Sequence, residues 1–179
     1  MPDITVAAPD LARRALAAAA DSGGRAVVLI DGRSGSGKTT LAAALLPLIP
    51  GAQLVALDDV YPGWEGLEAA SGVLESAILR PDAPGYRRWD WEASTPADWR
   101  VLSATAPLVV EGAGALTRVT ASAATLRVWV ELDEAERRSR ALARDGATYE
   151  PWWDSWAAQE RRHLARHHPE ALADVVLRG

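Results

Sequence analysis

Short, nearly continuous apolar runs alternate along the chain with longer segments rich in helix-forming residues. The runs contain mostly Val, Leu and Ile and are long enough for buried strands; they lie at residues 25–31, 53–57, 107–111, 125–131 and 174–178. Strands that alternate with helices and are apolar on both faces are typical of a parallel sheet covered on both sides. The pattern therefore predicts an α/β fold in three layers, with a five-stranded parallel sheet between helices.

The segments around these runs carry helix signals. Pro9 and Asp10 open one segment of strong helix formers, and a Gly-Gly pair closes it. Thr95 and Pro96 have the residue types of an N-cap and a first helical position, which predicts a short helix there. The predicted helices lie at residues 9–21, 38–47, 66–79, 95–104, 133–144 and 151–167.

Residues 80–98 contain several proline and glycine breakers and are predicted to be irregular. A loop this long in a compact domain is often functional. It carries Arg88 and Trp89 within the sequence YRRWDW, and the nearby Trp64 could join them. In such a segment the aromatic rings can stack on a ring of a ligand, and the cations can bind a sugar or an acid. The alternative is a surface flap whose Trp side chains cover the core.

The length, the charge and the composition of the chain exclude or disfavour several classes of function. The 179 residues fit a single domain spanning 1–179. The net charge of −5 disfavours a nucleic-acid partner, and the absence of cysteine excludes a thiolate metal site or a cysteine nucleophile. No apolar run reaches the length of a membrane span and no targeting segment is visible, so we expect a cytoplasmic protein without a membrane partner. The oligomeric state stays open.

Residues 32–39, GRSGSGKT, match the pattern G-x-x-x-x-G-K-[ST] between a predicted strand and a predicted helix. Glycines let successive backbone N–H groups approach a phosphate, and the helix adds its own free N–H groups. We expect Lys38 to reach the β- and γ-phosphates of ATP and Thr39 to ligate Mg²⁺. Arg33 occupies a free position and is expected to be solvated. The predicted nucleotide contacts are Gly32, Ser34, Gly35, Ser36, Gly37, Lys38, Thr39 and Thr40.

Carboxylates follow three of the predicted strands, where ligands of open α/β sheets bind. Asp58 and Asp59 follow the second strand; Asp58 is the candidate base for an acceptor hydroxyl, and the alternative is a turn or cap. Glu111 ends the third strand and can hold a water on Mg²⁺ or orient the acceptor. Asp31 precedes the phosphate loop and is expected to support it structurally.

Arg137, Arg140 and Arg144 share one face of the predicted helix at 133–144. Guanidinium groups on one face suit a lid, here residues 133–150, that closes on a transferring phosphoryl group. Arg140 and Arg144 are the better catalytic candidates. The alternative is a solvated helix held by i, i+4 ion pairs.

The chain has eight Trp and no Phe, and three of the Trp lie together at 152, 153 and 156. Core packing is the favoured role for these three. His163 and His167 have the i, i+4 spacing of a metal pair, but without a third ligand they are expected to be solvated.

With these residues in place, the chain resembles the uridine kinase family of P-loop small-molecule kinases, which also includes nicotinamide riboside, pantothenate and phosphoribulo-kinases. The resemblance rests on DGRSGSGKTTLA at 31–42, LDDVY at 57–61, VVEG at 109–112 and LDEAERRSRALARD at 132–145. It implies a P-loop fold with an arginine-bearing lid, whose pattern R-x-x-R-x-x-x-R-D is matched by Arg137, Arg140, Arg144 and Asp145. It also implies that Asp58 activates the acceptor hydroxyl and that Glu111 lies near Mg²⁺.

We therefore expect an ATP- and Mg²⁺-dependent kinase that acts on a hydroxyl of a nucleoside or a similar small molecule. Two alternatives stay open: an ATP-hydrolysing switch without a small acceptor, and an inactive interaction module that binds ATP as a structural ligand. The candidate substrate contacts are Asp58, Asp59, Tyr61, Trp64, Arg88, Trp89 and Glu111.

Overall fold

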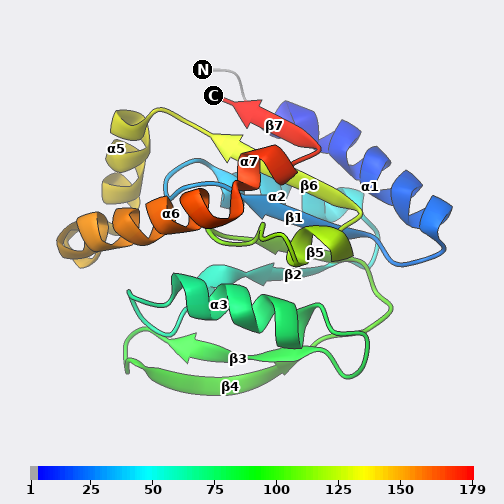
Figure 1. The fold of residues 1–179 in the computed structure, drawn as a ribbon, viewed down its shortest axis with the longest axis horizontal. Helices are drawn as coiled ribbons and strands as arrows, with labels where there is room; N and C mark the ends of the chain where they lie inside the picture. The colour runs from blue at the N-terminus through cyan, green and yellow to red at the C-terminus, as the bar shows by residue number, and fades with distance from the viewer. Residues whose placement is uncertain (1–3) are drawn as a thin grey trace.

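The computed structural model describes residues 4–179, except for the side chain of Asp145. Its centre is a five-stranded sheet in the order β2-β5-β1-β6-β7, with every neighbouring pair parallel (Figure 1). This confirms the predicted parallel sheet. The strands are β1 (Val27–Asp31), β2 (Gln53–Ala56), β5 (Leu108–Glu111), β6 (Leu126–Glu131) and β7 (Val175–Arg178).

Five of the six predicted helices form. The helix after the phosphate loop ends as a 3₁₀ turn at Leu46–Leu48, and the helix predicted at 66–79 is α-helical over Leu67–Val73 and continues as a π-helical segment at Leu74–Ile78. Among the described residues, no helix combines the length and the apolar character needed to cross a membrane. The helices are α1 (Ala8–Ser22), α2 (Lys38–Leu45), α3 (Leu67–Val73), α4 (Thr120–Ala123), α5 (Glu134–Asp145), α6 (Trp153–His167) and α7 (Pro169–Leu172).

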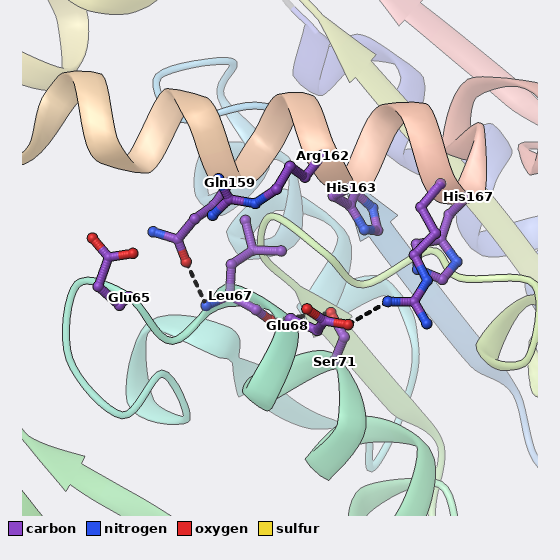
Figure 2. Close-up of a pocket in the computed structure, with 9 residues that line it drawn as sticks. Glu65, Leu67, Glu68, Ser71, Gln159, Arg162, His163 and His167 are labelled. Atoms are coloured by element: carbon purple, nitrogen blue, oxygen red, sulfur yellow. Dashed lines mark hydrogen bonds and ion pairs between the residues drawn. The ribbon is translucent and has the colours of Figure 1, made fainter.

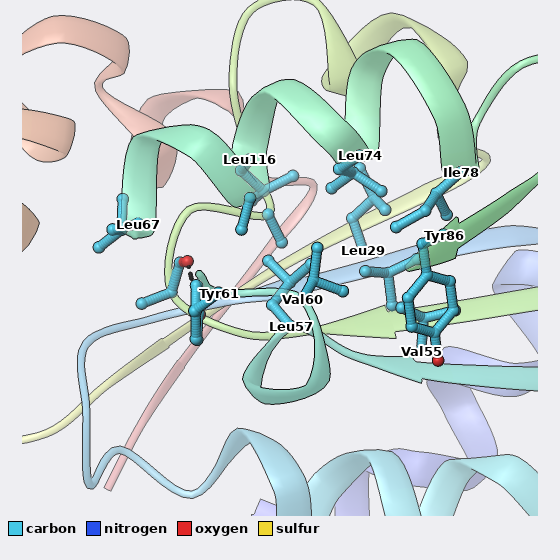
Figure 3. Close-up of a cluster of buried hydrophobic side chains, with 14 of the residues drawn as sticks. Leu29, Val55, Leu57, Val60, Tyr61, Leu67, Leu74, Ile78, Tyr86 and Leu116 are labelled. Atoms are coloured by element: carbon cyan, nitrogen blue, oxygen red, sulfur yellow. Dashed lines mark hydrogen bonds between the residues drawn. The ribbon is translucent and has the colours of Figure 1, made fainter. Parts of the chain in front are cut away.

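The sheet separates two apolar clusters because successive side chains of a strand point to opposite faces. Val28 and Ile30 of β1 pack with α1 and α2 on one face. Val27 and Leu29 pack on the other face in a cluster that includes residues of α3 and α6. Figure 3 shows this second cluster below α3, where Leu29 lies beneath Leu74. Both faces of the sheet are thus covered.

Residues 80–98 are not an irregular loop, and residues 95–104 are not a helix. Instead β3 (Gly85–Asp90) and β4 (Thr95–Val101) form an antiparallel hairpin, which lies beside α3 in Figure 1. Cross-strand pairing outweighs the local cap signal of Thr95 and Pro96. The buried ring of Tyr86 anchors the hairpin in the cluster beneath α3 (Figure 3).

The second strand was expected to be buried, but β2 is an edge strand of the sheet. Its side chain Leu54 is 39% exposed, while Val55 is fully buried against the α3 side. An apolar run of this length does not distinguish an edge from a centre. Because β2 pairs with β5 up to Ala56 and Glu111, the turn that follows β2 lies beside the carboxyl end of β5.

Candidate functional site

The candidate phosphate loop, residues 32–39, connects the central strand β1 to α2, as the motif predicts. Gly35 has a φ of 79°, and a Cβ there would clash with the carbonyl oxygen of Arg137. Gly37, with a φ of 102°, leads into the first turn of α2. The hydroxyl of Ser36 is buried and has no hydrogen-bond partner among the described residues. A tightly turned loop with an unpaired buried hydroxyl fits an anionic ligand.

A small cavity of about 160 Å³ lies between this loop and α5. It brings together the ammonium-bearing Lys38 and the lid candidates Arg140 and Arg144 from a helix about a hundred residues away in the chain. Arg140 also pairs with Glu136 at 3.1 Å, as the i, i+4 alternative predicts. The lining residues are Gly35, Gly37, Lys38, Thr39, Thr40, Arg140, Ala141 and Arg144.

Arg137 does not join this cavity. Its side chain is only 2% exposed, and its guanidinium donates to the carbonyl oxygens of Leu132 (3.1 Å) and Ser34 (3.2 Å). It therefore fastens the start of α5 to the phosphate loop. Arg33, expected to be solvated, instead donates to Glu131 at 2.8 Å and is half-buried.

Asp31 supports the loop from the end of β1. Its buried carboxylate accepts N–H bonds from Gly32 (2.6 Å), Gly114 (3.1 Å) and Leu116 (2.8 Å). The same carboxylate lies 3.1 Å from Nε2 of His163 on α6. The expected structural role of Asp31 agrees with this geometry. His163 is buried, so its predicted exposure to solvent is wrong: α6 lies against the end of β1.

Glu111 and Thr39 meet where Mg²⁺ would be expected. The Thr39 hydroxyl donates to Oε1 of Glu111 at 3.0 Å. Burial raises the pKa of Glu111, and the nearby Asp58 charge adds to this, while Lys38 and the Thr39 hydrogen bond oppose it. No group of three His, Cys, Asp or Glu side chains that could hold a metal occurs in the described chain. One hydroxyl and one carboxylate fit Mg²⁺, which keeps several waters and takes its other ligands from substrate phosphates.

A larger cavity of about 620 Å³ opens beside the phosphate loop, over the carboxyl ends of β2 and β5. Its polar end contains Asp58 and Glu111, and its walls are aromatic. It shares Thr39 and Arg144 with the smaller cavity, so the two cavities meet at these residues. The lining residues are Ser34, Thr39, Ala56, Asp58, Tyr61, Trp64, Trp91, Glu111, Arg144, Thr148, Tyr149 and Trp156.

The aromatic walls are packed against one another around Trp64. Its ring stacks on Tyr149, with centroids 5.2 Å apart and planes at 11°, and on Trp152 at 5.9 Å and 8°. Trp91 lies tilted at 4.9 Å, and Trp156 meets Trp64 edge-on at 6.4 Å. Such contacts hold the rings in fixed orientations. The cavity therefore presents rigid, flat apolar surfaces.

The predicted substrate contacts divide into two groups. Asp58, Tyr61, Trp64 and Glu111 line the larger cavity, whereas Asp59, Arg88 and Trp89 lie outside its described lining. Arg88 forms an ion pair with Asp98 across the hairpin instead.

The hairpin reaches the cavity through a different residue. Trp91, at the hairpin turn, donates its indole N–H to the carbonyl oxygen of Asp58 at 2.7 Å. The sequence analysis did not predict Thr148, Tyr149 and Trp156 as substrate contacts, although the first two lie in the predicted lid segment 133–150. A run of aromatic residues after the lid helix is the only signal that could have indicated them. The predicted core role of Trp156 is correct, since it is buried, but it is also a cavity wall.

A third cavity of about 240 Å³ lies between α3 and α6 (Figure 2). At its edge Gln159 accepts the N–H of Leu67 at 3.2 Å and donates to the carbonyl oxygen of Trp64 at 2.7 Å. On the exposed side Arg166 of α6 pairs with Glu68 of α3. These contacts fix α6 to the segment that carries Trp64.

No family model and no curated protein matches the chain. Among solved structures, a possible uridine kinase from Bacillus stearothermophilus is similar: it is 21% identical, the match covers 94% of this chain and 99% of that one, and the TM-score is 0.55. A candidate fructose transport system kinase from Silicibacter sp. TM1040 is 19% identical over 94% of this chain and 97% of its own, with a TM-score of 0.54. The chain thus has the uridine-kinase-like P-loop fold, and at this identity the likeness concerns the fold alone.

Proposed function

We propose that the protein transfers the γ-phosphoryl group of Mg·ATP to a hydroxyl of a small molecule, by resemblance a nucleoside or a similar metabolite. The observation that carries this proposal is that the cavity over the phosphate loop and the aromatic cavity meet at Thr39 and Arg144. A phosphoryl group held in the first cavity can face a hydroxyl held in the second. Catalysis of phosphoryl transfer depends mainly on such positioning and on electrostatic stabilisation.

The nucleotide side consists of the loop amides and Lys38. The ammonium of Lys38 now donates to the carbonyl oxygen of Arg33 at 3.2 Å, within the loop it would serve. Thr39 would ligate Mg²⁺, and Glu111 would hold one of its waters; the ion neutralises charge on the phosphates. Ser34 lines the aromatic cavity, whereas most of the loop residues that follow it line the smaller cavity. Its backbone N–H donates to Glu160 at 2.6 Å.

The acceptor side combines a base with flat walls. Asp58 follows β2 on a 3₁₀ turn, Leu57–Asp59, and lines the aromatic cavity close enough to Glu111 to raise that residue's pKa. In this proposal its carboxylate accepts the hydroxyl proton as the oxygen attacks. Arg144, which borders both cavities, stabilises the transferred charge. Arg140 acts from the phosphate side.

The test is ADP release from Mg·ATP with a panel of nucleosides, ribosides, sugars and other small alcohols, with Asp58→Asn as the matched control. We expect one acceptor class to raise turnover well above the background, and the Asn variant to lose about 100-fold or more of that increase. The variant should still bind Mg·ADP, because Asp58 is not on the nucleotide side. If ATP binds and no acceptor changes a slow hydrolysis, the protein is a switch or binding module and the kinase proposal is wrong.

A further inference from the structure

One face of α6 contacts the phosphate loop, its support Asp31 and the segments that form the aromatic cavity. Trp156, Gln159, Glu160 and His163 follow the spacing of a single helix face and are all buried. Trp156 is a wall of the aromatic cavity, Gln159 holds the segment with Trp64, and His163 contacts Asp31 below the phosphate loop. Three of these residues therefore have a packing or anchoring role. Glu160 has a more unusual position.

The carboxylate of Glu160 links the phosphate loop to a wall of the aromatic cavity through one oxygen atom. Oε1 accepts the backbone N–H of Ser34 at 2.6 Å and the indole N–H of Trp156 at 3.1 Å. Ser34 belongs to the phosphate loop, whereas Trp156 is the wall that meets Tyr61 edge-on at 4.8 Å on the acceptor side. A shift of either partner therefore changes the hydrogen-bond geometry of the other.

Burying a carboxylate costs free energy unless hydrogen bonds and opposite charges offset the lost hydration. Burial raises the pKa of Glu160, while the Ser34 N–H and the charges of Lys38 and Arg137 oppose this rise. An apolar side chain would fill the same space without that cost, but it could not accept either N–H. Only a side chain with an acceptor oxygen can bind both the Ser34 amide and the Trp156 indole here and so keep them at a fixed separation.

We propose that Glu160 is a positioning residue: its Oε1 holds the phosphate loop and the Trp156 wall in register, so that the nucleotide and the acceptor are presented to each other. The inference rests on the proposed function. A loop already held in its binding conformation loses less entropy when it binds phosphate, so loss of this contact weakens nucleotide binding.

The experiment compares Glu160→Gln, Glu160→Leu and Trp156→Phe, with calorimetric Kd values for Mg·ADP and a non-hydrolysable ATP analogue. Gln keeps an acceptor oxygen without the charge, so its Kd should stay within about threefold of wild type, whereas Leu should weaken binding about tenfold or more. Phe retains a ring but lacks the indole N–H, so its effect should lie between the two. Arg162→Leu is the control: it changes a polar residue to an apolar one on the same helix, at an exposed position that lines neither cavity of the proposed site, and it should leave the nucleotide Kd unchanged.

Amide hydrogen exchange of the peptide over residues 32–39 provides a second readout. Exchange should increase in Glu160→Leu and stay at the wild-type level in Glu160→Gln. A Gln variant that binds as weakly as Leu, or a Leu variant that binds like wild type, overturns the inference while the proposed function stands. If wild type itself does not bind Mg·ADP, the proposed function fails, and the inference fails with it. Should Glu160→Leu not fold, the Gln and Phe variants decide alone.

Discussion

The two cavities of the proposed site are built in different ways. The phosphate side comes mainly from one continuous segment, residues 32–40, and depends on backbone N–H groups and glycine conformations. The acceptor side comes from side chains of separate segments: the turn after β2, the hairpin turn at Trp91, the residues after α5 and the start of α6. A contiguous loop keeps its shape through local backbone geometry. A cavity assembled from distant side chains exists only when the whole fold is in place.

This difference has a consequence for mutations. A change on the phosphate side should abolish chemistry and leave the aromatic cavity intact, whereas a change on the acceptor side should alter the choice of acceptor and leave nucleotide binding intact. Residues where the cavities meet should affect both. The following variants test this separation, from the largest expected effect to the smallest.

Lys38→Met removes the ammonium from the phosphate side and should lower kcat/KM for Mg·ATP by about 1,000-fold or more, because that charge stabilises the transferred group. Met has a similar length, so the aromatic cavity should keep its geometry. Steady-state ADP release checks the rate, and near-UV circular dichroism of the Trp cluster checks the cavity. A variant that keeps turnover within tenfold of wild type would contradict the assigned role.

Glu111 lines the aromatic cavity and accepts a hydrogen bond from Thr39, where the two cavities meet. Glu111→Gln should raise the Mg²⁺ concentration needed for half-maximal activity by about 10- to 100-fold, since a neutral amide holds a metal-bound water less well. Burial raises the pKa of Glu111, so wild-type activity should fall on acidification at a higher pH than an ordinary glutamate would cause. The Gln variant cannot titrate there and should lack that part of the acid limb. Rates measured over a pH series at several Mg²⁺ concentrations separate these effects.

Trp64→Ala removes the centre of the aromatic walls. It should raise the acceptor KM by about tenfold, in line with the loss of one stacking surface, while the Kd for Mg·ADP stays the same. Trp99→Ala is the matched control, because Trp99 lies on the hairpin, is 49% exposed and does not line the cavity. Equal effects of the two variants on the acceptor KM would show that the cavity does not bind the acceptor.

Arg127→Ala lies outside both cavities and measures stability alone. Arg127 pairs with Asp174 between β6 and β7; partial burial tends to raise the pKa of Asp174, but the hydrogen bonds from Arg127 outweigh it and the net pKa is lowered. The loss should be about 0.5–1 kcal/mol, because the pair is partly exposed.

A carboxylate with a lowered folded-state pKa contributes stability above its unfolded pKa of about 3.9 and loses that contribution as the pH falls through the folded value. Urea unfolding at pH 7 should therefore show the full difference between wild type and Arg127→Ala, and the difference should shrink in acid. An unchanged difference at low pH would mean that the pair acts through packing only.

Much of this architecture could be predicted, and the errors have a common cause. The sheet, the phosphate loop and the main helices follow from periodicity and from local caps. The local sequence predicts a loop and a helix where the hairpin forms, because Thr95 and Pro96 give a strong local signal while the anchoring of Tyr86 is non-local. The local sequence likewise predicts an exposed His163, because its partner Asp31 lies 132 positions away in the chain.

By itself, the sequence determined which segments form the central sheet and which loop is the candidate phosphate site. The strands follow from their apolar runs, and the loop follows from the conformational freedom of a few glycines in one short segment. Only the tertiary structure decided that Trp91 reaches Asp58, that Tyr149 stacks on Trp64 and that Glu160 contacts Ser34 across 126 positions. These contacts depend on how far each helix extends over the sheet and on which face it presents. Those properties result from the packing of the whole chain, and no local pattern of residues records them.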